Sequence, residues 1–144
     1  MPCTLESTRT GIPPWSMPCA APLEPNAEPK KQALGVEGDA AFQIDCQETA
    51  TARENAISFV VCVGNDMSLS AIHSAQVLSY GGRAYGTEFK VNVNTASAAE
   101  AFGGAGQKVD DPKAISSALD KALSSRVPYV IDIVVDTEEN PIFN

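Results

Sequence analysis

Residues 57–63, ISFVVCV, form an almost unbroken run of β-branched and other apolar side chains. The run lacks the polar–apolar alternation of a strand with one wet face, and it is typical of a strand buried on both faces. Such strands belong to parallel sheets that are covered by helices on both sides. This stretch therefore predicts the centre of an α/β sheet.

Strand and helix patterns alternate on either side of this run. The further expected strands are 34–36 and 128–136, and the expected helices are 46–55, 68–80, 96–102 and the segment after Asp111. Asp111 followed by Pro112 is a favourable helix start, because Asp caps free amides and Pro tolerates the first turn. Alternation of this kind indicates parallel strands joined by right-handed crossovers. We predict a doubly wound, mainly parallel α/β sheet with flanking helices.

The 144 residues divide into two regions of different composition. Seven of the ten prolines fall within the first 30 residues, without a periodic apolar pattern, so residues 1–32 are expected to be irregular and disordered. Residues 33–144 carry the strand and helix patterns and are expected to form one domain. A net charge of −8 disfavours a nucleic-acid partner. No run approaches the roughly 18 apolar residues of a membrane span, so no membrane partner is expected.

The four cysteines, Cys3, Cys19, Cys46 and Cys62, show no paired metal-binding spacing. The N-terminus has neither the apolar core of a signal peptide nor the Arg-rich character of a transit peptide. We therefore expect reduced thiols in a cytoplasmic protein.

Polar residues follow two of the expected strands. Gly38 and Asp39 come after the first, and Asn65 and Asp66 come after the run 57–63. Because the carboxyl ends of parallel strands meet at one edge of the sheet, Asp39 and Asn65 should lie close together although they are 26 positions apart. A carboxylate, an amide oxygen and a backbone carbonyl suit Mg²⁺, with water and phosphate oxygens completing its shell. For Gly38 and Asp39 alone, a capped turn is the alternative interpretation.

Residues 38–66, GDAAFQIDCQETATARENAISFVVCVGND, resemble the thiamine-diphosphate motif, which begins Gly-Asp-Gly and ends Asn-Asn after a similar interval. YGGRAYGTEF, ASAAEAFGGAGQKVDDPKAISSALDKAL and PYVIDIVVDTEENP are similar to the C-terminal part of acetolactate synthase-like enzymes, which include pyruvate and benzoylformate decarboxylases. The resemblance covers about residues 33–143, and WSMPCAAPLEPNAEP looks like a weakened form of the preceding helix and loop. It implies the thiamine-diphosphate-binding fold, shortened at its N-terminus.

The resemblance also implies a role for each motif residue. Asp39 and Asn65 match the side-chain ligands of Mg²⁺, and the carbonyl of Met67 would be the third protein ligand. The residues at the cofactor would be Gly38, Asp39, Ala40, Ala41, Asn65 and Met67. The motif's second glycine is Ala40 here, and its first asparagine is Gly64. An ungapped match would put Asp66 in place of Asn65, but Asn65 aligns VVCV with the family's buried strand.

The resemblance implies a chain that binds thiamine diphosphate through Mg²⁺, as part of an enzyme that decarboxylates or carboligates 2-oxo acids. In this family a glutamate of a separate N-terminal domain, usually from the neighbouring subunit, activates the aminopyrimidine. The residues before 33 are too few for that domain, so we assign no catalytic residue to this chain. We expect a partner subunit carrying the pyrimidine-binding domain, or a homo-oligomer. The alternative is a non-catalytic remnant that acts as a fragment or interaction module.

Three further features have ordinary structural interpretations. His73 is expected to be a surface or packing residue, Asp132 a polar position near a strand edge, and the stretch GGAG at 103–106 a helix cap and turn. If other domains normally cover this one, apolar side chains near the motif edge should be exposed. The candidates are Met67, Leu69, Ile72, Tyr80 and Tyr85.

Overall fold

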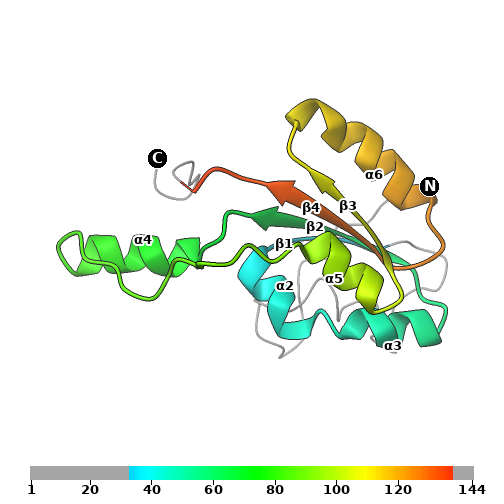
Figure 1. The fold of residues 1–144 in the computed structure, drawn as a ribbon, viewed down its shortest axis with the longest axis horizontal. Coiled ribbons are helices and arrows are strands. Elements are labelled where there is room, and N and C mark those ends of the chain that lie inside the picture. The colour runs from blue at the N-terminus through cyan, green and yellow to red at the C-terminus, as the bar shows by residue number, and fades with distance from the viewer. Residues whose placement is uncertain (1–32, 138–144) are drawn as a thin grey trace.

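Four parallel strands form a sheet with helices on both of its faces in the computed structural model, which describes residues 33–137 (Figure 1). The expectation for residues 1–32 lies outside the described residues. The elements are β1 (Ala33–Gly38), α2 (Asp39–Asp45), α3 (Glu48–Glu54), β2 (Phe59–Asn65), α4 (Ser70–Ser79), α5 (Thr95–Ala101), β3 (Ala105–Val109), the 3-10 turn η2 (Pro112–Ala114), α6 (Ile115–Ser124) and β4 (Tyr129–Val134). The predicted doubly wound parallel sheet is confirmed.

The strand order is β1-β2-β4-β3, so β2 and β4 are the two central strands. Val61 of β2 and Ile131 of β4 have no exposed surface, as expected for strands covered on both faces. The central strand begins and ends two residues later than the run 57–63 predicted. Ile57 is tied to the preceding helix by its N–H bond to the carbonyl of Ala52 (2.9 Å), whereas Gly64 and Asn65 continue the pairing with β4.

Each face of the sheet has its own apolar core, because side chains alternate between the two faces along every strand. On one face α2, α3 and α5 cover a cluster of Phe42, Ala52, Phe59, Val61, Val63, Ala99 and Val130. On the other face α6 packs on Val60, Val109, Ala118, Ala122, Tyr129 and Ile131 (Figure 1). The predicted helix 46–55 corresponds to α3, and a short helix that was not predicted, α2, precedes it from Asp39.

The Gly-rich stretch expected to be a turn is part turn and part strand. Gly103 ends the segment after α5 with a φ of +83°, the left-handed conformation of a helix C-terminus. Gly106 lies within β3, where a Cβ would stand 2.5 Å from the carbonyl oxygen of Ala96. This glycine is therefore needed for the close approach of α5 to the sheet rather than for a turn.

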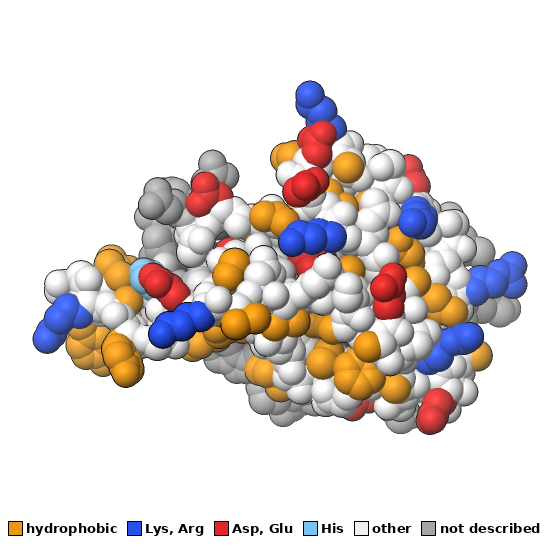
Figure 2. All heavy atoms as spheres, viewed as in Figure 1, with side chains coloured by type: hydrophobic (Ala, Val, Ile, Leu, Met, Phe, Trp, Pro, Cys, Tyr) orange, Lys and Arg blue, Asp and Glu red, His pale blue; other side chains and the backbone are white. Residues whose placement is uncertain are grey.

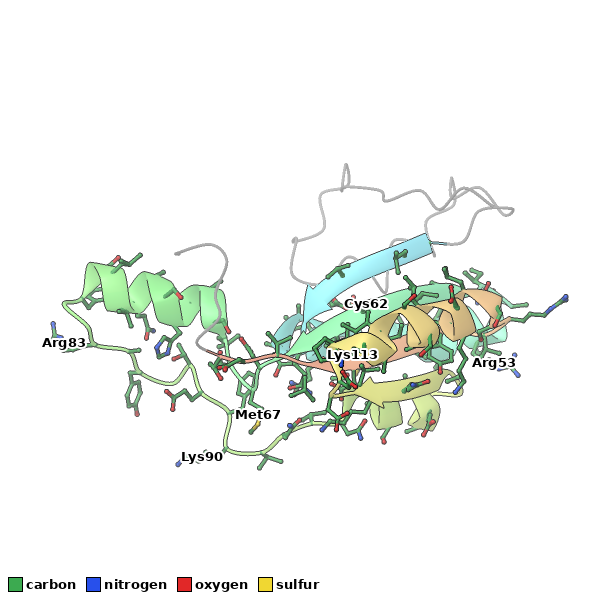
Figure 3. The ribbon with its side chains drawn as sticks, turned by 90° about the horizontal axis from the view of Figure 1, so that it is seen from above. Arg53, Cys62, Met67, Arg83, Lys90 and Lys113 are labelled. Atoms are coloured by element: carbon green, nitrogen blue, oxygen red, sulfur yellow. The ribbon has the colours of Figure 1, made fainter. Side chains whose placement is uncertain are left out.

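An arm extends beyond the carboxyl ends of the strands. It consists of α4 and the returning segment 80–94, and both views of the ribbon show it projecting from the sheet (Figures 1 and 3). No residue of α4 is buried, and Leu78, Tyr80 and Tyr85 are 68%, 60% and 92% exposed. Hydrophobic side chains gather at the outer end of the arm (Figure 2). The helix predicted at 68–80 is thus confirmed, but it lies outside the core.

Candidate functional site

Asp39 and Asn65 occupy neighbouring positions at the carboxyl edge of the sheet. Gly38 pairs with Gly64 in the register of β1 and β2, so the residue after each glycine lies at the same level. Asp39 is the first residue of α2, and Asn65 is the last residue of β2. Both are 3% exposed. The structure therefore brings these two predicted site residues together.

The carboxylate of Asp39 is held in an environment that disfavours its charge. Burial raises the pKa of Asp39 above its usual 3.8, and the negative charge of Asp66 raises it further. Hydrogen bonding with the backbone amides of Ala40 and Met67 acts in the opposite direction. A cation placed beside Asp39 would compensate both unfavourable effects, since it attracts the two carboxylates at once.

The side-chain amide of Asn65 has a defined orientation. Its nitrogen Nδ2 donates to Oδ1 of Asn92 (3.1 Å), to the carbonyl of Val93 (3.1 Å) and to Oδ1 of Asp132 (3.0 Å). Three acceptors around one atom are compatible only with the NH₂ end of the amide. Oδ1 of Asn65 is consequently turned away from these acceptors.

The next two residues differ in what their polar atoms contact. Oδ1 of Asp66 accepts from the N–H of Ser68 (3.0 Å) and Oδ2 accepts from Oγ of Ser70, so this side chain turns along its own chain. Met67 lies at the base of the arm (Figure 3) and has a φ of +59°, a left-handed conformation that is uncommon for residues other than glycine. Its carbonyl accepts from the N–H of Phe89 (2.8 Å), which leaves one lone pair.

The start of α2 contains the remaining predicted residues. Gly38 is the N-cap residue in an extended conformation, with φ −84° and ψ 162°. The N–H of Ala40 donates to Oδ1 of Asp39 (2.8 Å), so it is directed at a side chain of this chain. Ala41 follows in the first turn, where helix amides have no partner within the helix.

Asp132 is a residue whose importance the sequence interpretation missed. It was expected near a strand edge, but it lies in the central strand β4 with no exposed surface. It accepts from Nδ2 of Asn65 (3.0 Å) and from the N–H of Thr95 (2.9 Å). The usable signal was an aspartate inside an apolar run, because a buried carboxylate needs hydrogen-bond donors.

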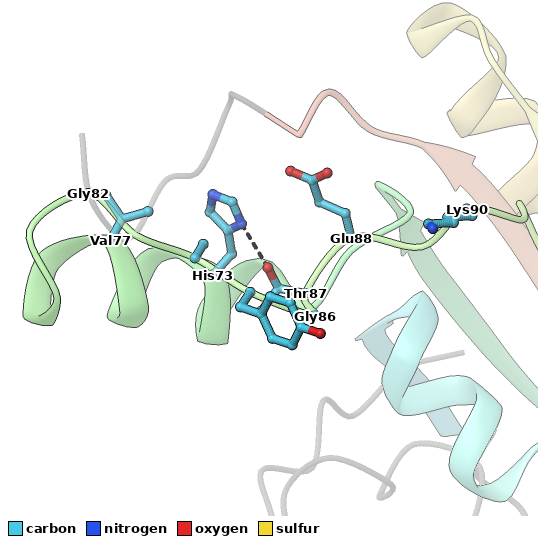
Figure 4. A pocket seen from close by; sticks show the side chains of 9 residues that line it. His73, Val77, Gly82, Gly86, Thr87, Glu88 and Lys90 are labelled. Carbon is cyan, nitrogen blue, oxygen red and sulfur yellow. Dashed lines mark hydrogen bonds between the residues drawn. The ribbon is translucent and has the colours of Figure 1, made fainter.

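The arm holds a cleft of about 410 Å³ between α4 and the returning segment (Figure 4). His73 lines this cleft, and its Nδ1 lies 2.9 Å from Oγ1 of Thr87. Neither Asp39 nor Asn65 lines the cleft. The structure thus places the single histidine in the arm, hydrogen-bonded to a neighbouring side chain.

Three observations limit the chemistry of the described part of the chain. Within residues 33–137, no three His, Cys, Asp or Glu side chains form a group that could bind a metal. A metal near Asp39 would therefore depend on amide, carbonyl and ligand oxygens. Burial raises the pKa of the Cys62 thiol, and burial followed by the charge of Asp45 raises that of Cys46, which makes both less reactive. No helix between residues 33 and 137 has the length and apolar character needed to span a bilayer.

Comparison with known proteins identifies the family to which the chain is similar. Residues 5–133 match the family model described as "Thiamine pyrophosphate enzyme, C-terminal TPP binding domain". The chain is 29% identical over 110 residues to the "Probable acetolactate synthase large subunit" of Methanococcus aeolicus, covering 76% of this chain and 18% of that protein. It is 32% identical over 115 residues to the acetolactate synthase large subunit of Haemophilus influenzae, covering 79% and 20%. The chain thus spans about a fifth of the length of these relatives.

A solved structure has the same fold. The thiamine diphosphate-dependent 4-hydroxybenzoylformate decarboxylase of Rhodococcus jostii RHA1 superposes with a TM-score of 0.75. The match covers 85% of this chain and 23% of that one, at 21% sequence identity.

Proposed function

The chain belongs to the thiamine pyrophosphate enzyme family, as its C-terminal TPP-binding domain, and on that basis we propose that it binds thiamine pyrophosphate (thiamine diphosphate) through a Mg²⁺ ion bridging the diphosphate. It would do so as part of an enzyme that decarboxylates or carboligates 2-oxo acids. The domain is proposed to span residues 33–144, with residues 1–32 as an irregular segment ahead of it.

The observation that carries this proposal is that Asp39 and Asn65 follow the paired residues Gly38 and Gly64 at one edge of the sheet. Asp39 is a buried carboxylate whose charge is disfavoured, and a divalent cation would stabilise it. Carboxylate, amide and carbonyl oxygens are the donors that Mg²⁺ takes from proteins, together with phosphate oxygens and water. The residues present therefore fit the ion.

Asn65 is a better candidate ligand than Asp66. No residue between 33 and 137 donates a hydrogen bond to Oδ1 of Asn65, because its three contacts all involve Nδ2. Both carboxylate oxygens of Asp66 accept from nearby serines. The carbonyl of Met67 retains a lone pair for the third protein ligand, and its left-handed backbone is the kind of local strain that clusters at functional sites.

The diphosphate would lie against the start of α2. The amide of Ala41 and the extended backbone at Gly38 are available there, whereas the amide of Ala40 is directed at Asp39. When bound, thiamine pyrophosphate supplies the carbanion chemistry of the reaction. The residues of this chain hold its diphosphate end.

The second candidate function is a non-catalytic remnant, which the motif departures Ala40 and Gly64 would favour. Neither departure disturbs the backbone. Ala40 lies in α2 with an ordinary helical conformation, and a Cβ on Gly64 would meet Cγ2 of Val135 at 3.6 Å, a normal contact. This supports the binding function over the remnant. The rest of the enzyme would come from a partner subunit with the pyrimidine-binding domain, or from an oligomer.

Calorimetry on the purified 144-residue chain tests the proposal. We expect thiamine pyrophosphate to bind only with a divalent metal, weakly, and Asp39→Ala to abolish binding. Asp120→Ala, on the exposed face of α6, is the matched control and should bind as the unmodified chain does. Equal binding in excess chelator would contradict the metal bridge. Binding that appears only after Ala40→Gly and Gly64→Asn restore the motif would favour the remnant.

A further inference from the structure

Asp132 is an acidic side chain at the centre of the sheet that the proposed ligand set does not use. It lies in β4 between β2 and β3, with no exposed surface. Its two donors in the described part of the chain are both uncharged, namely Nδ2 of Asn65 and the backbone N–H of Thr95. Burying a carboxylate is costly, and two such hydrogen bonds only partly offset that cost. Because burial of this carboxylate lowers the stability of the fold, we expect a specific role for Asp132.

The two contacts of Asp132 hold its carboxylate in one orientation. Oδ2 accepts from Thr95 N–H at the first residue of α5, and Oδ1 accepts from Asn65 across the sheet. Because α5 packs tightly on β3 at Gly106, the N–H of Thr95 at the start of α5 has a fixed position. Oδ1 is thereby presented to the end of β2.

The contact with Asn65 selects which end of the amide faces inward. Nδ2 has three acceptors for its two hydrogens, and Asp132 is the one among them that has no exposed surface and is also held by the N–H of Thr95. A flip of the amide would place Oδ1 against a carboxylate, a carbonyl and another amide oxygen. That arrangement is repulsive, so Nδ2 stays inward and Oδ1 stays outward.

We propose that Asp132 is a positioning residue that keeps Oδ1 of Asn65 directed toward the Mg²⁺–diphosphate site. The inference rests on the proposed function, since it assigns Asp132 a task at the same site. Asp132 itself does not contact the metal in this arrangement. Replacing a residue that orients a metal ligand by hydrogen bonding commonly lowers metal affinity by about 10- to 100-fold.

Asp132→Asn tests the inference with little change of shape. An asparagine replaces one of the two acceptor oxygens with an NH₂ group, so either the N–H of Thr95 or Nδ2 of Asn65 would face a donor instead of an acceptor. We expect the Kd for Mn²⁺ in the presence of thiamine pyrophosphate, measured by electron paramagnetic resonance, to rise on the order of 10- to 100-fold. In ¹⁵N-resolved NMR spectra, the side-chain amide signals of Asn65 should shift in the metal-free protein.

Two controls separate positioning from general loosening. Asn94→Ala removes the cap of α5, where Asn94 accepts from Ser97 N–H (2.9 Å), but it leaves the contact between Asp132 and Asn65. Asn92→Ala removes an exposed acceptor of Nδ2. Both should leave the Kd within a few-fold and the Asn65 signals close to their original positions. An equal loss of affinity in D132N and N94A would overturn the inference in favour of a merely structural role.

Three further results would distinguish failure of this inference from failure of the proposed function. Binding by the unmodified chain with an unchanged Kd in D132N would overturn this inference alone. Absence of binding by the unmodified chain would overturn the proposed function and this inference with it. If D132N does not fold, hydrogen exchange in the unmodified chain decides. Side-chain amide protons of Asn65 that exchange much more slowly than those of the exposed Asn94 support the inference, and equal rates overturn it.

Discussion

Asp39 and Asp66, which follow neighbouring strands, lie close enough for the charge of one to act on the other. Burial is the first reason why the pKa of Asp39 is raised above 3.8, and the charge of Asp66 is the next unfavourable contribution. Two acidic groups at one sheet edge repel each other and so lower the stability of the fold. A divalent cation bound between them would attract both carboxylates and remove this repulsion. The first two predictions follow from this arrangement.

Asp39→Asn should stabilise the chain in the absence of metal while it abolishes cofactor binding. The raised pKa means that ionised Asp39 costs stability at neutral pH, so removing the charge should increase the free energy of unfolding. The gain should shrink as the pH falls through the raised pKa toward 3.8, because Asp39 is then protonated in both states. Urea unfolding at two pH values measures it. A loss of stability at neutral pH would contradict the prediction.

Metal binding should weaken as the pH falls, and it should do so above the usual titration range of an aspartate. Mg²⁺ or Mn²⁺ requires the ionised form of Asp39, whose pKa is raised by burial and then by Asp66. Asp66→Asn removes the second cause, so the midpoint of binding should move to lower pH. Binding of Mn²⁺ with thiamine pyrophosphate across a pH series checks this. If Asp66 rather than Asn65 is the ligand, Asp66→Asn will instead abolish binding at every pH.

Gly106→Ala should destabilise the fold more than Gly64→Ala does. A Cβ at Gly106 would stand 2.5 Å from backbone oxygen and 2.7 Å from Cα of Ala96, so α5 must move off β3. Overpacking of this kind typically costs about 1–3 kcal/mol. A Cβ at Gly64 meets its nearest atom at 3.6 Å and should change stability little. Urea unfolding of both variants gives the comparison, and equal losses would show that the contact at Gly106 relaxes freely.

The 144-residue chain by itself should release no carbon dioxide from pyruvate above background, even with thiamine pyrophosphate and Mg²⁺. The chain spans 18–20% of the acetolactate synthase relatives that it matches, and the group that activates the aminopyrimidine is expected outside it. General acid–base help is worth about 10²–10⁴-fold in rate. A coupled assay on homogeneous protein measures this. Turnover that survives further purification would contradict the prediction.

The arm should drive self-association of the isolated chain. Leu78 and Tyr85 expose apolar surface on the arm, and such patches favour association. Sedimentation velocity should show mass increasing with concentration, and Leu78→Lys with Tyr85→Lys should reduce it. Ile44→Lys, at an exposed apolar position on α2, is the control and should have less effect. A monomer at high concentration would argue against the arm as an interface.

Local patterns were sufficient to predict the parallel sheet and the meeting of Asp39 with Asn65, but they missed the strand β3 (Ala105–Val109). The apolar run at 57–63 indicates a buried strand without reference to any other segment, and parallel strands bring their carboxyl ends to one edge. The strand order β1-β2-β4-β3 was beyond such reasoning, because it depends on which distant segments pair.

The role of Asp132 could not be predicted for the same physical reason. Its partners Asn65 and Thr95 are 67 and 37 positions away in the sequence, so only the completed fold shows what it contacts. Gly106 is a similar case. In sequence it resembles a turn glycine, and only the position of Ala96 shows that its missing side chain makes room for a helix.

The order of strands also has a consequence for biosynthesis. The central strand β4 is the last of the four described strands along the chain, and it inserts between β2 and β3, with Val60 opposite Tyr129. While a nascent chain lacks β4, β2 and β3 each present an open apolar edge, and such edges promote aggregation. Pairing of β4 with β2 is also slow, because the long segment between Asn65 and Tyr129 separates the two strands in the sequence. A ribosome that stalls before Tyr129 therefore leaves a chain in which β1 can pair with β2 but β3 has no partner strand.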